Sequence, residues 1–172
     1  MASGGPAFDK LKVVVIDDNE HMRILLHSML TAFGIRTVVG ASNGKTGFTT
    51  VQSVRPDFVV TDFAMHPIDG VELVKMIRSL PGPISYLPII MCTGHGERHY
   101  IERARDSGIT EFLSKPVTAR DLLVRITEVI ERPRQFVKAP SFIGPDRRRK
   151  KMPIWQTPKR RASDQESEFE FR

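Results

Sequence analysis

Four short hydrophobic runs in this chain each end in polar residues. The runs and their ends lie at residues 13–18, 58–62, 89–93 and 111–116. Runs of this length, rich in valine and isoleucine, are typical of strands buried on both faces of a parallel sheet. Ligands of open α/β sheets bind just outside the carboxyl ends of the strands. We therefore expect the polar ends of the four runs to form one site.

Segments with helical spacing of apolar residues alternate with these runs up to about residue 131. The first helix is predicted from Met22, Leu25, Leu26, Met29, Leu30 and Phe33. Further helices are expected near residues 44–54, 71–80, 97–107 and 118–130, and a further strand near residues 36–40. Five βα units predict an α/β fold, a doubly wound parallel sheet with helices on both faces.

The character of the chain changes at residue 132. Residues 132–172 show no sustained apolar period and carry 12 Lys and Arg against 5 Asp and Glu, a balance of +7. Residues 1–131 carry 14 against 15, so the net charge of +6 belongs to the tail. A segment with so few periodic apolar residues cannot offset its ordering entropy. We predict a flexible N-terminus (1–10), a folded domain (11–131) and a disordered, basic, proline- and arginine-rich tail (132–172).

Composition also indicates where the protein resides. No apolar run approaches the length of about 20 residues that spans a bilayer, and residues 1–10 lack the pattern of a secretory signal. Cys92 is the single cysteine, so no internal disulfide can form. We expect a cytoplasmic protein without a transmembrane segment.

The polar residues at the strand ends suit metal-assisted phosphoryl transfer. Asp17, Asp18 and Asp62 offer carboxylate oxygens, which Mg²⁺ binds together with water and phosphate oxygens. Lys115 offers a compact positive charge and Thr93 a hydroxyl, both suited to phosphoryl oxygens. Taken alone, the Asp17-Asp18 pair would indicate only a helix cap. Its combination with Asp62 and Lys115 favours a metal and phosphoryl site.

In order and spacing, these residues resemble the receiver domain of two-component response regulators, the CheY-like type. The resemblance covers about residues 11–131 and rests on Asp17-Asp18, Asp62, Met65 with Asp69-Gly70, Thr93, Phe112 and Lys115-Pro116. It implies a flavodoxin-like (βα)5 sheet with strand order 2-1-3-4-5. The chain departs from the family at His66, which separates Met65 from Pro67, and at Ala64, whose side chain cannot bind the attacking water.

The resemblance implies a role for each site residue. The implied catalytic residues are Asp62, as phosphoacceptor nucleophile, with Lys115 and Thr93. The implied Mg²⁺ ligands are Asp17, Asp18, Asp62 and the backbone carbonyl of Ala64. The implied switch pair is Thr93 and Phe112, and the Lys115-Pro116 bond is expected to be cis. The chain is then a phosphoacceptor switch that catalyses only its own phosphorylation and dephosphorylation, rather than a turnover enzyme.

The resemblance also implies partners. These are a histidine kinase or histidine phosphotransfer protein as donor and an unidentified protein target, with a binding face that includes Arg98, Tyr100, Arg105, Glu111 and Arg120. A second hypothesis makes the basic tail an output element that binds nucleic acid or an anionic surface. The tail is too short and proline-rich for a helix-turn-helix, so we favour protein binding. The sequence does not decide between a monomer and a homodimer, nor does it identify the kinase or the process.

Overall fold

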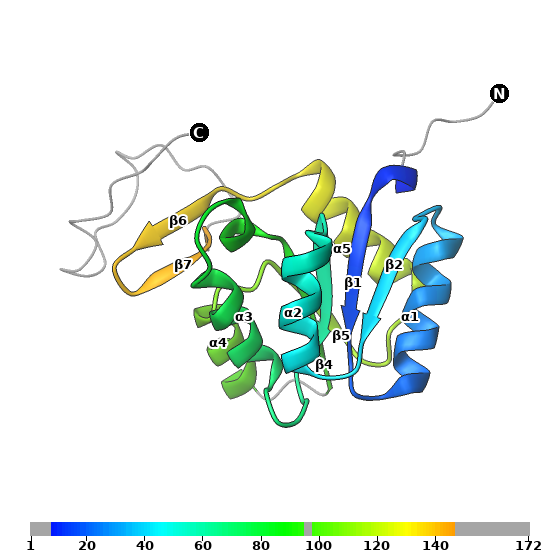
Figure 1. Ribbon diagram of the computed structural model, residues 1–172, viewed down its shortest axis with the longest axis horizontal. Helices are drawn as coiled ribbons and strands as arrows, with labels where there is room; N and C mark the ends of the chain where they lie inside the picture. Colours follow the sequence, from blue (N-terminus) through cyan, green and yellow to red (C-terminus); the bar gives the residue numbers. More distant parts are fainter. Residues whose placement is uncertain (1–7, 95–97, 147–172) are drawn as a thin grey trace.

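Five parallel strands form the central sheet of the protein (Figure 1). The structure, a computed structural model, describes residues 8–94 and 98–146, without the side chains of residues 98 and 99. The strand order is β2-β1-β3-β4-β5. The elements of the sheet and its helices are β1 (Lys12–Ile16), α1 (Glu20–Ala32), β2 (Thr37–Ala41), α2 (Gly44–Val54), β3 (Phe58–Asp62), α3 (Gly70–Arg78), β4 (Ile89–Thr93), α4 (Arg98–Asp106), β5 (Glu111–Ser114) and α5 (Ala119–Glu131). This order confirms the expected flavodoxin-like (βα)5 fold.

The side chains of the strands divide between two cores. Val13 and Val15 of β1 pack with residues of α1 and α5, whereas Val14 and Ile16 pack with residues of α2 and α3. Neighbouring residues of a strand point to opposite faces of the sheet, which explains this division. All five residues of β3 and of β4 are buried, because the inner strands are covered on both faces. The valine- and isoleucine-rich runs therefore form the interior of the domain.

Strand register brings the polar ends of the runs to one edge of the sheet. Ile16 of β1 pairs with Thr61 of β3, so Asp17 and Asp62 follow side by side. Thr93 of β4 pairs with Ser114 of β5, which directly precedes Lys115. Parallel strands thus deliver residues that are far apart in sequence to a common edge.

Helix caps hold the chain as it leaves the strands. The side chain of Asn19 accepts hydrogen bonds from the backbone N–H groups of His21 and Met22, so α1 begins directly after the acidic pair. Thr118 caps α5 by accepting from the N–H of Asp121. Asparagine and threonine are both favoured at this position, because their side-chain oxygens accept from the free N–H groups of the first helical turn.

Residues 136–145 form an antiparallel hairpin, whereas the sequence predicts disorder throughout residues 132–172. Its strands are β6 (Phe136–Ala139) and β7 (Phe142–Pro145). The hairpin lies near the start of β4 and β5, at the end of the sheet opposite the site, beside the short helix η2 (Pro83–Tyr86) (Figure 1). Strands of four residues are too short to show a sustained apolar period, and their contacts lie far away in sequence. Residues 147–172 of the predicted tail lie outside the described residues.

The N-terminal prediction also needs correction at residues 8–10. These residues form the short helix η1 (Phe8–Lys10), and Phe8 is only 5% exposed because it packs in the core beside α1 and α5. Residues 1–7 lie outside the described residues. Within the described ranges, no helix combines the length and the apolar character needed to cross a bilayer.

Candidate metal and phosphoryl site

Three carboxylates meet where β1 and β3 end. One oxygen from each of Asp17, Asp18 and Asp62 lies within 4.8 Å of the other two. Asp17 is 1% exposed and Asp62 is 5% exposed, whereas Asp18 is open to solvent. Like charges held this close repel one another unless a cation compensates them. The sequence-based prediction that these three residues come together is confirmed.

Lys115 supplies positive charge to this cluster. Its Nζ lies 2.7 Å from Asp62 Oδ1 and 3.9 Å from Asp17 Oδ2. Burial acts to lower the pKa of Lys115, but the hydrogen bond to Asp62 and the negative charge around it outweigh burial, so the pKa lies above its ordinary value. The ammonium is therefore charged across the physiological range. The Lys115-Pro116 bond is cis, as the resemblance implies, and so is His66-Pro67.

One carboxylate oxygen of Asp17 is buried with no hydrogen-bond partner among the described residues. This oxygen is Oδ2, while Oδ1 accepts a hydrogen bond of 2.9 Å from the backbone N–H of Asn19. Burial raises the pKa of Asp17, and its effect exceeds the opposing effect of the Asn19 hydrogen bond. A buried carboxylate oxygen without a donor, beside two further carboxylates, matches the oxygen ligands of Mg²⁺. The predicted role of the Ala64 carbonyl stays a prediction.

Arg23 holds the main chain of the acidic pair in place. From α1, its Nη1 donates to the carbonyl oxygen of Asp17 at 2.8 Å and to that of Asp18 at 3.3 Å. Both carbonyls are thereby fixed while their side chains face the cluster. The role of Arg23 is not apparent from the sequence, because an arginine on a helix, six positions after an aspartate, has no distinctive local pattern.

The chain segment after Asp62 passes close to the start of α3. A Cβ atom at Gly70 would collide with the carbonyl oxygen of Asp62, and the Gly70 N–H donates to the carbonyl of Phe63 at 2.9 Å. Asp69 caps α3 through the N–H of Glu72. Only glycine at position 70 allows this approach. The Asp69-Gly70 pair therefore shapes the loop that follows the candidate nucleophile.

The candidate switch residues lie on neighbouring strands. Thr93 is 8% exposed at the end of β4, and Phe112 of β5 is half-buried against the core that faces α2 and α3. The implied role of Thr93 and Phe112 as a switch pair stays a prediction.

Cys92 lies in β4 directly before Thr93. Burial raises the pKa of the Cys92 thiol to about 12, so Cys92 is protonated at neutral pH and packs as a small apolar residue.

The predicted binding face needs one correction. Glu111 is 5% exposed and is therefore not a solvated surface position. Its carboxylate lies 3.4 Å from Arg125 and 2.8 Å from Arg134. Arg134 belongs to the C-terminal extension, the described residues 132–146 that follow α5. Tyr100 is exposed as expected, and its ring contacts the edge of Phe63 at a centroid distance of 5.0 Å. The C-terminal extension therefore covers part of the surface that the sequence assigns to partners.

Comparison with known proteins agrees with this geometry. The family model of the response regulator receiver domain matches residues 13–127. The chemotaxis protein CheY of Pseudomonas aeruginosa is 30% identical over 122 residues, which cover 71% of this chain and 98% of that protein. Among solved structures, chemotaxis protein CheY4 of Vibrio cholerae has a TM-score of 0.66 at 27% identity, covering 70% of this chain and 98% of that one. A receiver domain protein of Clostridium thermocellum has a TM-score of 0.65 at 30% identity, with coverages of 71% and 95%. The chain therefore belongs to the response regulator receiver family.

Proposed function

We propose that this protein is a phosphorylation-controlled switch in which Asp62 accepts a phosphoryl group from a phosphohistidine of a kinase or phosphotransfer protein. The observation that carries the proposal is the contact of 2.7 Å between Lys115 Nζ and Asp62 Oδ1, inside a cluster of three carboxylates. This arrangement supports the proposal because a candidate nucleophile, a cation and candidate metal ligands lie together.

The proposed reaction is a displacement at phosphorus. A carboxylate oxygen of Asp62 forms a bond to phosphorus while the bond from phosphorus to the donor's imidazole nitrogen breaks, and the imidazole leaves with the electron pair. Lys115 and the Thr93 hydroxyl stabilise the charge on the non-bridging oxygens. Asp62 is modified once per event, so the chain acts as a phosphoacceptor rather than as a turnover enzyme.

The buried acidic cluster is suited to hold Mg²⁺ during this reaction. Asp17, Asp18 and Asp62 would provide carboxylate oxygens, together with the Ala64 carbonyl. When bound, Mg²⁺ supplies positive charge that offsets the negative charge of the carboxylates and of the phosphoryl group. Arg23 fixes the main chain of the two ligands on the β1 side. Lys115 holds Asp62 on the opposite side.

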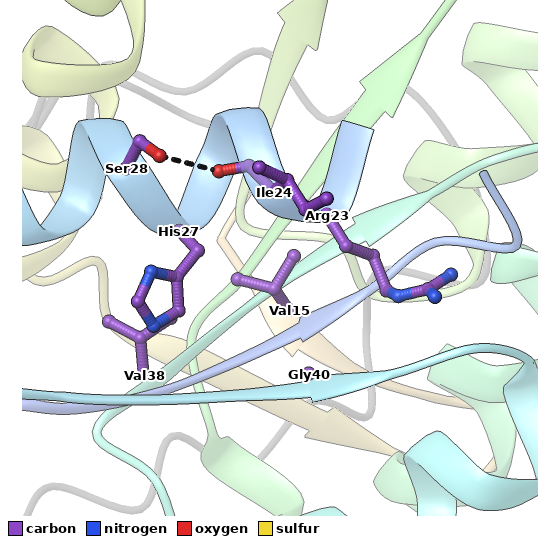
Figure 2. Close-up of a pocket in the computed structure, with 7 residues that line it drawn as sticks. All are labelled: Val15, Arg23, Ile24, His27, Ser28, Val38 and Gly40. Atoms are coloured by element: carbon purple, nitrogen blue, oxygen red, sulfur yellow. Dashed lines mark hydrogen bonds between the residues drawn. The ribbon is translucent and has the colours of Figure 1, made fainter. Parts of the chain in front are cut away.

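A shallow groove beside the site is suited to the docking of the donor protein. It lies between α1 and β2 and is lined by Val15, Arg23, Ile24, His27, Ser28, Val38 and Gly40 (Figure 2). Ile24 is 57% exposed and the neighbouring Leu25 is 41% exposed, so two adjacent apolar side chains of α1 are open to solvent at the groove. Arg23 joins the groove to the backbone of the acidic pair. A donor seated on α1 would thus bind next to the start of the helix, which follows the acidic pair in the chain.

The proposal is tested by incubating the full chain with acetyl phosphate and following its intact mass. We expect the gain of one phosphoryl group in the presence of Mg²⁺, no gain with a chelator, and no gain in the Asp62→Ala variant. Asp9→Ala is the matched control, since exposed Asp9 lies before β1 and hence at the other end of the sheet. If Asp62→Ala takes up phosphate as fast as the parent, Asp62 is not the acceptor.

A second candidate function concerns the basic tail. Asp146 is fixed by a hydrogen bond of 2.7 Å from its N–H to the carbonyl of Gln135, and five basic residues, 147–151, follow it directly in sequence. A basic segment that begins at a fixed point of the domain is suited to nucleic-acid phosphates. Protein binding stays the favoured output. A steep decrease of nucleic-acid affinity with salt, abolished by deleting residues 147–172, would reverse this ranking.

A further inference from the structure

The C-terminal extension wraps around the start of β5, the edge strand of the sheet. On the side of α5, Arg134 Nη2 lies 2.8 Å from the carboxylate of Glu111, the first residue of β5. On the side of α3 and α4, a Cβ atom at Gly144 would lie 2.7 Å from the Cα of Gly108. Figure 1 shows the chain passing from α5 to the hairpin beside α3. Residues 134–146, here named the strap, thus contact the domain on both sides of one strand.

The strap covers a buried arginine that joins three parts of the domain. Arg78 at the end of α3 is 4% exposed, and its guanidinium donates to the carbonyl oxygens of Ser85, Leu87 and Gly108 at 2.7–3.0 Å. The ring of Phe136 stacks on it, with 5.0 Å from Arg78 Cζ to the ring centroid. Gly108 lies in the loop that connects α4 to β5. Through Arg78, this loop is therefore joined to α3 and to Phe136 of the strap.

The two elements held by the strap also form one side of the phosphoryl site. Strand β5 begins at Glu111, continues through Phe112, and is followed directly by Lys115 after Ser114. Helix α4 follows Thr93 in the chain and is joined to the loop after Asp62 by the Phe63–Tyr100 ring contact. Strand β5 has only four residues, so a short stretch of hydrogen-bonded backbone joins the residue held by the strap to the residue before Lys115.

We propose that the strap holds β5 and α4 in the arrangement of the unphosphorylated domain, and that its attachment opposes the rearrangement that accompanies phosphorylation of Asp62. The kinetic part of this proposal rests on the proposed function. The family match ends at residue 127, so the strap lies outside the part of the chain that the receiver model matches. Coupling between two sites is reciprocal: phosphorylation weakens the attachment of the strap, and release of the strap promotes phosphorylation.

The test uses the full chain with Arg134→Ala, which removes the contact to Glu111. Arg132→Ala is the matched control, because Arg132 lies two residues earlier and pairs only at the surface with Glu128 on α5, with its side chain 75% exposed. Arg134→Lys keeps the positive charge but lacks the planar guanidinium group. Its hydrogen-exchange and phosphorylation rates are therefore expected to lie between those of the parent and of Arg134→Ala. Phe136→Leu removes the ring that stacks on Arg78 and so weakens the other attachment of the strap. Leucine is chosen because it removes less apolar volume than alanine would, so that the variant still folds.

Two measurements decide the outcome. Hydrogen exchange of the unphosphorylated protein is expected to be about 5-fold faster or more at residues 109–115 in Arg134→Ala and Phe136→Leu, and unchanged in Arg132→Ala. The rate of phosphorylation by acetyl phosphate is expected to increase by a similar factor in the same two variants.

The proposal is overturned if exchange increases only within residues 134–146, or if the phosphorylation rate of both strap variants equals that of the parent. A parent that takes up no phosphate would contradict the proposed function and the kinetic half of this inference. The exchange result would still show whether the strap holds β5.

Discussion

Replacement of Asp17 by asparagine separates the stability of the domain from its capacity to bind a metal ion. The change removes one buried negative charge and keeps the size of the side chain. The asparagine side-chain oxygen can still accept the hydrogen bond from the Asn19 N–H. The perturbation therefore acts mainly on the electrostatics of the acidic cluster.

The magnitude follows from the distances in the cluster. With an effective dielectric constant of about 20, the repulsion between Asp17 and Asp62 at 4.8 Å or less is about 3 kcal/mol or more, and the attraction to Lys115 at 3.9 Å is about 4 kcal/mol. The exposed carboxylate of Asp18 adds about 1 kcal/mol of repulsion, since water screens it. These contributions nearly cancel, so the unfavourable burial of the Asp17 charge decides the sign. We expect Asp17→Asn to raise the free energy of unfolding by about 1–2 kcal/mol without metal.

Urea unfolding with and without Mg²⁺ measures this effect. The parent is expected to gain about 1.4 kcal/mol at a Mg²⁺ concentration of about ten times Kd, because the ion binds only the folded state. Asp17→Asn is expected to gain little or nothing, and exposed Asp9→Asn should behave as the parent. The reasoning is refuted if Asp17→Asn is less stable than the parent without metal, or if both proteins gain the same stability from Mg²⁺.

Three further predictions address the loop, the lysine and the docking groove. Gly70→Ala should lower the free energy of unfolding by about 2 kcal/mol or more in thermal denaturation, because its Cβ meets the Asp62 carbonyl oxygen, and an unchanged Tm would contradict this. The raised pKa of Lys115 means that its contribution to stability is complete below its unfolded pKa of 10.5 and is lost as pH rises through the higher folded pKa. The stability difference between parent and Lys115→Met should therefore diminish only above about pH 10.5, and a decrease near neutral pH would count against the ion pair. Ile24→Asp should slow transfer from a phosphohistidine donor by about 10-fold or more while leaving phosphorylation by acetyl phosphate unchanged, and equal losses in both assays would argue against docking on α1.

The positions of the site residues could be predicted because the topology of a parallel sheet is simple. Asp17, Asp62, Thr93 and Lys115 each follow a hydrophobic run, and the carboxyl ends of parallel strands lie at one edge. The strand topology alone predicts that these residues lie together, without knowledge of any side-chain contact. The Ala64 carbonyl ligand and the cis bond at Lys115 are expected from the family resemblance alone.

The residues that the sequence analysis missed depend on contacts between distant segments. Arg23 acts on backbone carbonyls, which every residue has, so nothing in the sequence marks its partners. The strap contacts Arg78 of α3, Gly108 in the loop between α4 and β5, and Glu111 of β5, which are far apart in the sequence. Glu111 contacts both Arg125 of α5 and Arg134 of the strap, and neither contact is visible in the sequence around Glu111.

The most direct test of the central claim is to identify the residue that carries the phosphoryl group. After incubation of the full chain with acetyl phosphate and Mg²⁺, borohydride reduces an aspartyl phosphate to homoserine, and peptide mass spectrometry locates the change. We expect homoserine at position 62 and at no other aspartate. Homoserine at Asp17 or Asp18, or an unmodified Asp62 in a protein that has gained a phosphoryl group, would contradict it.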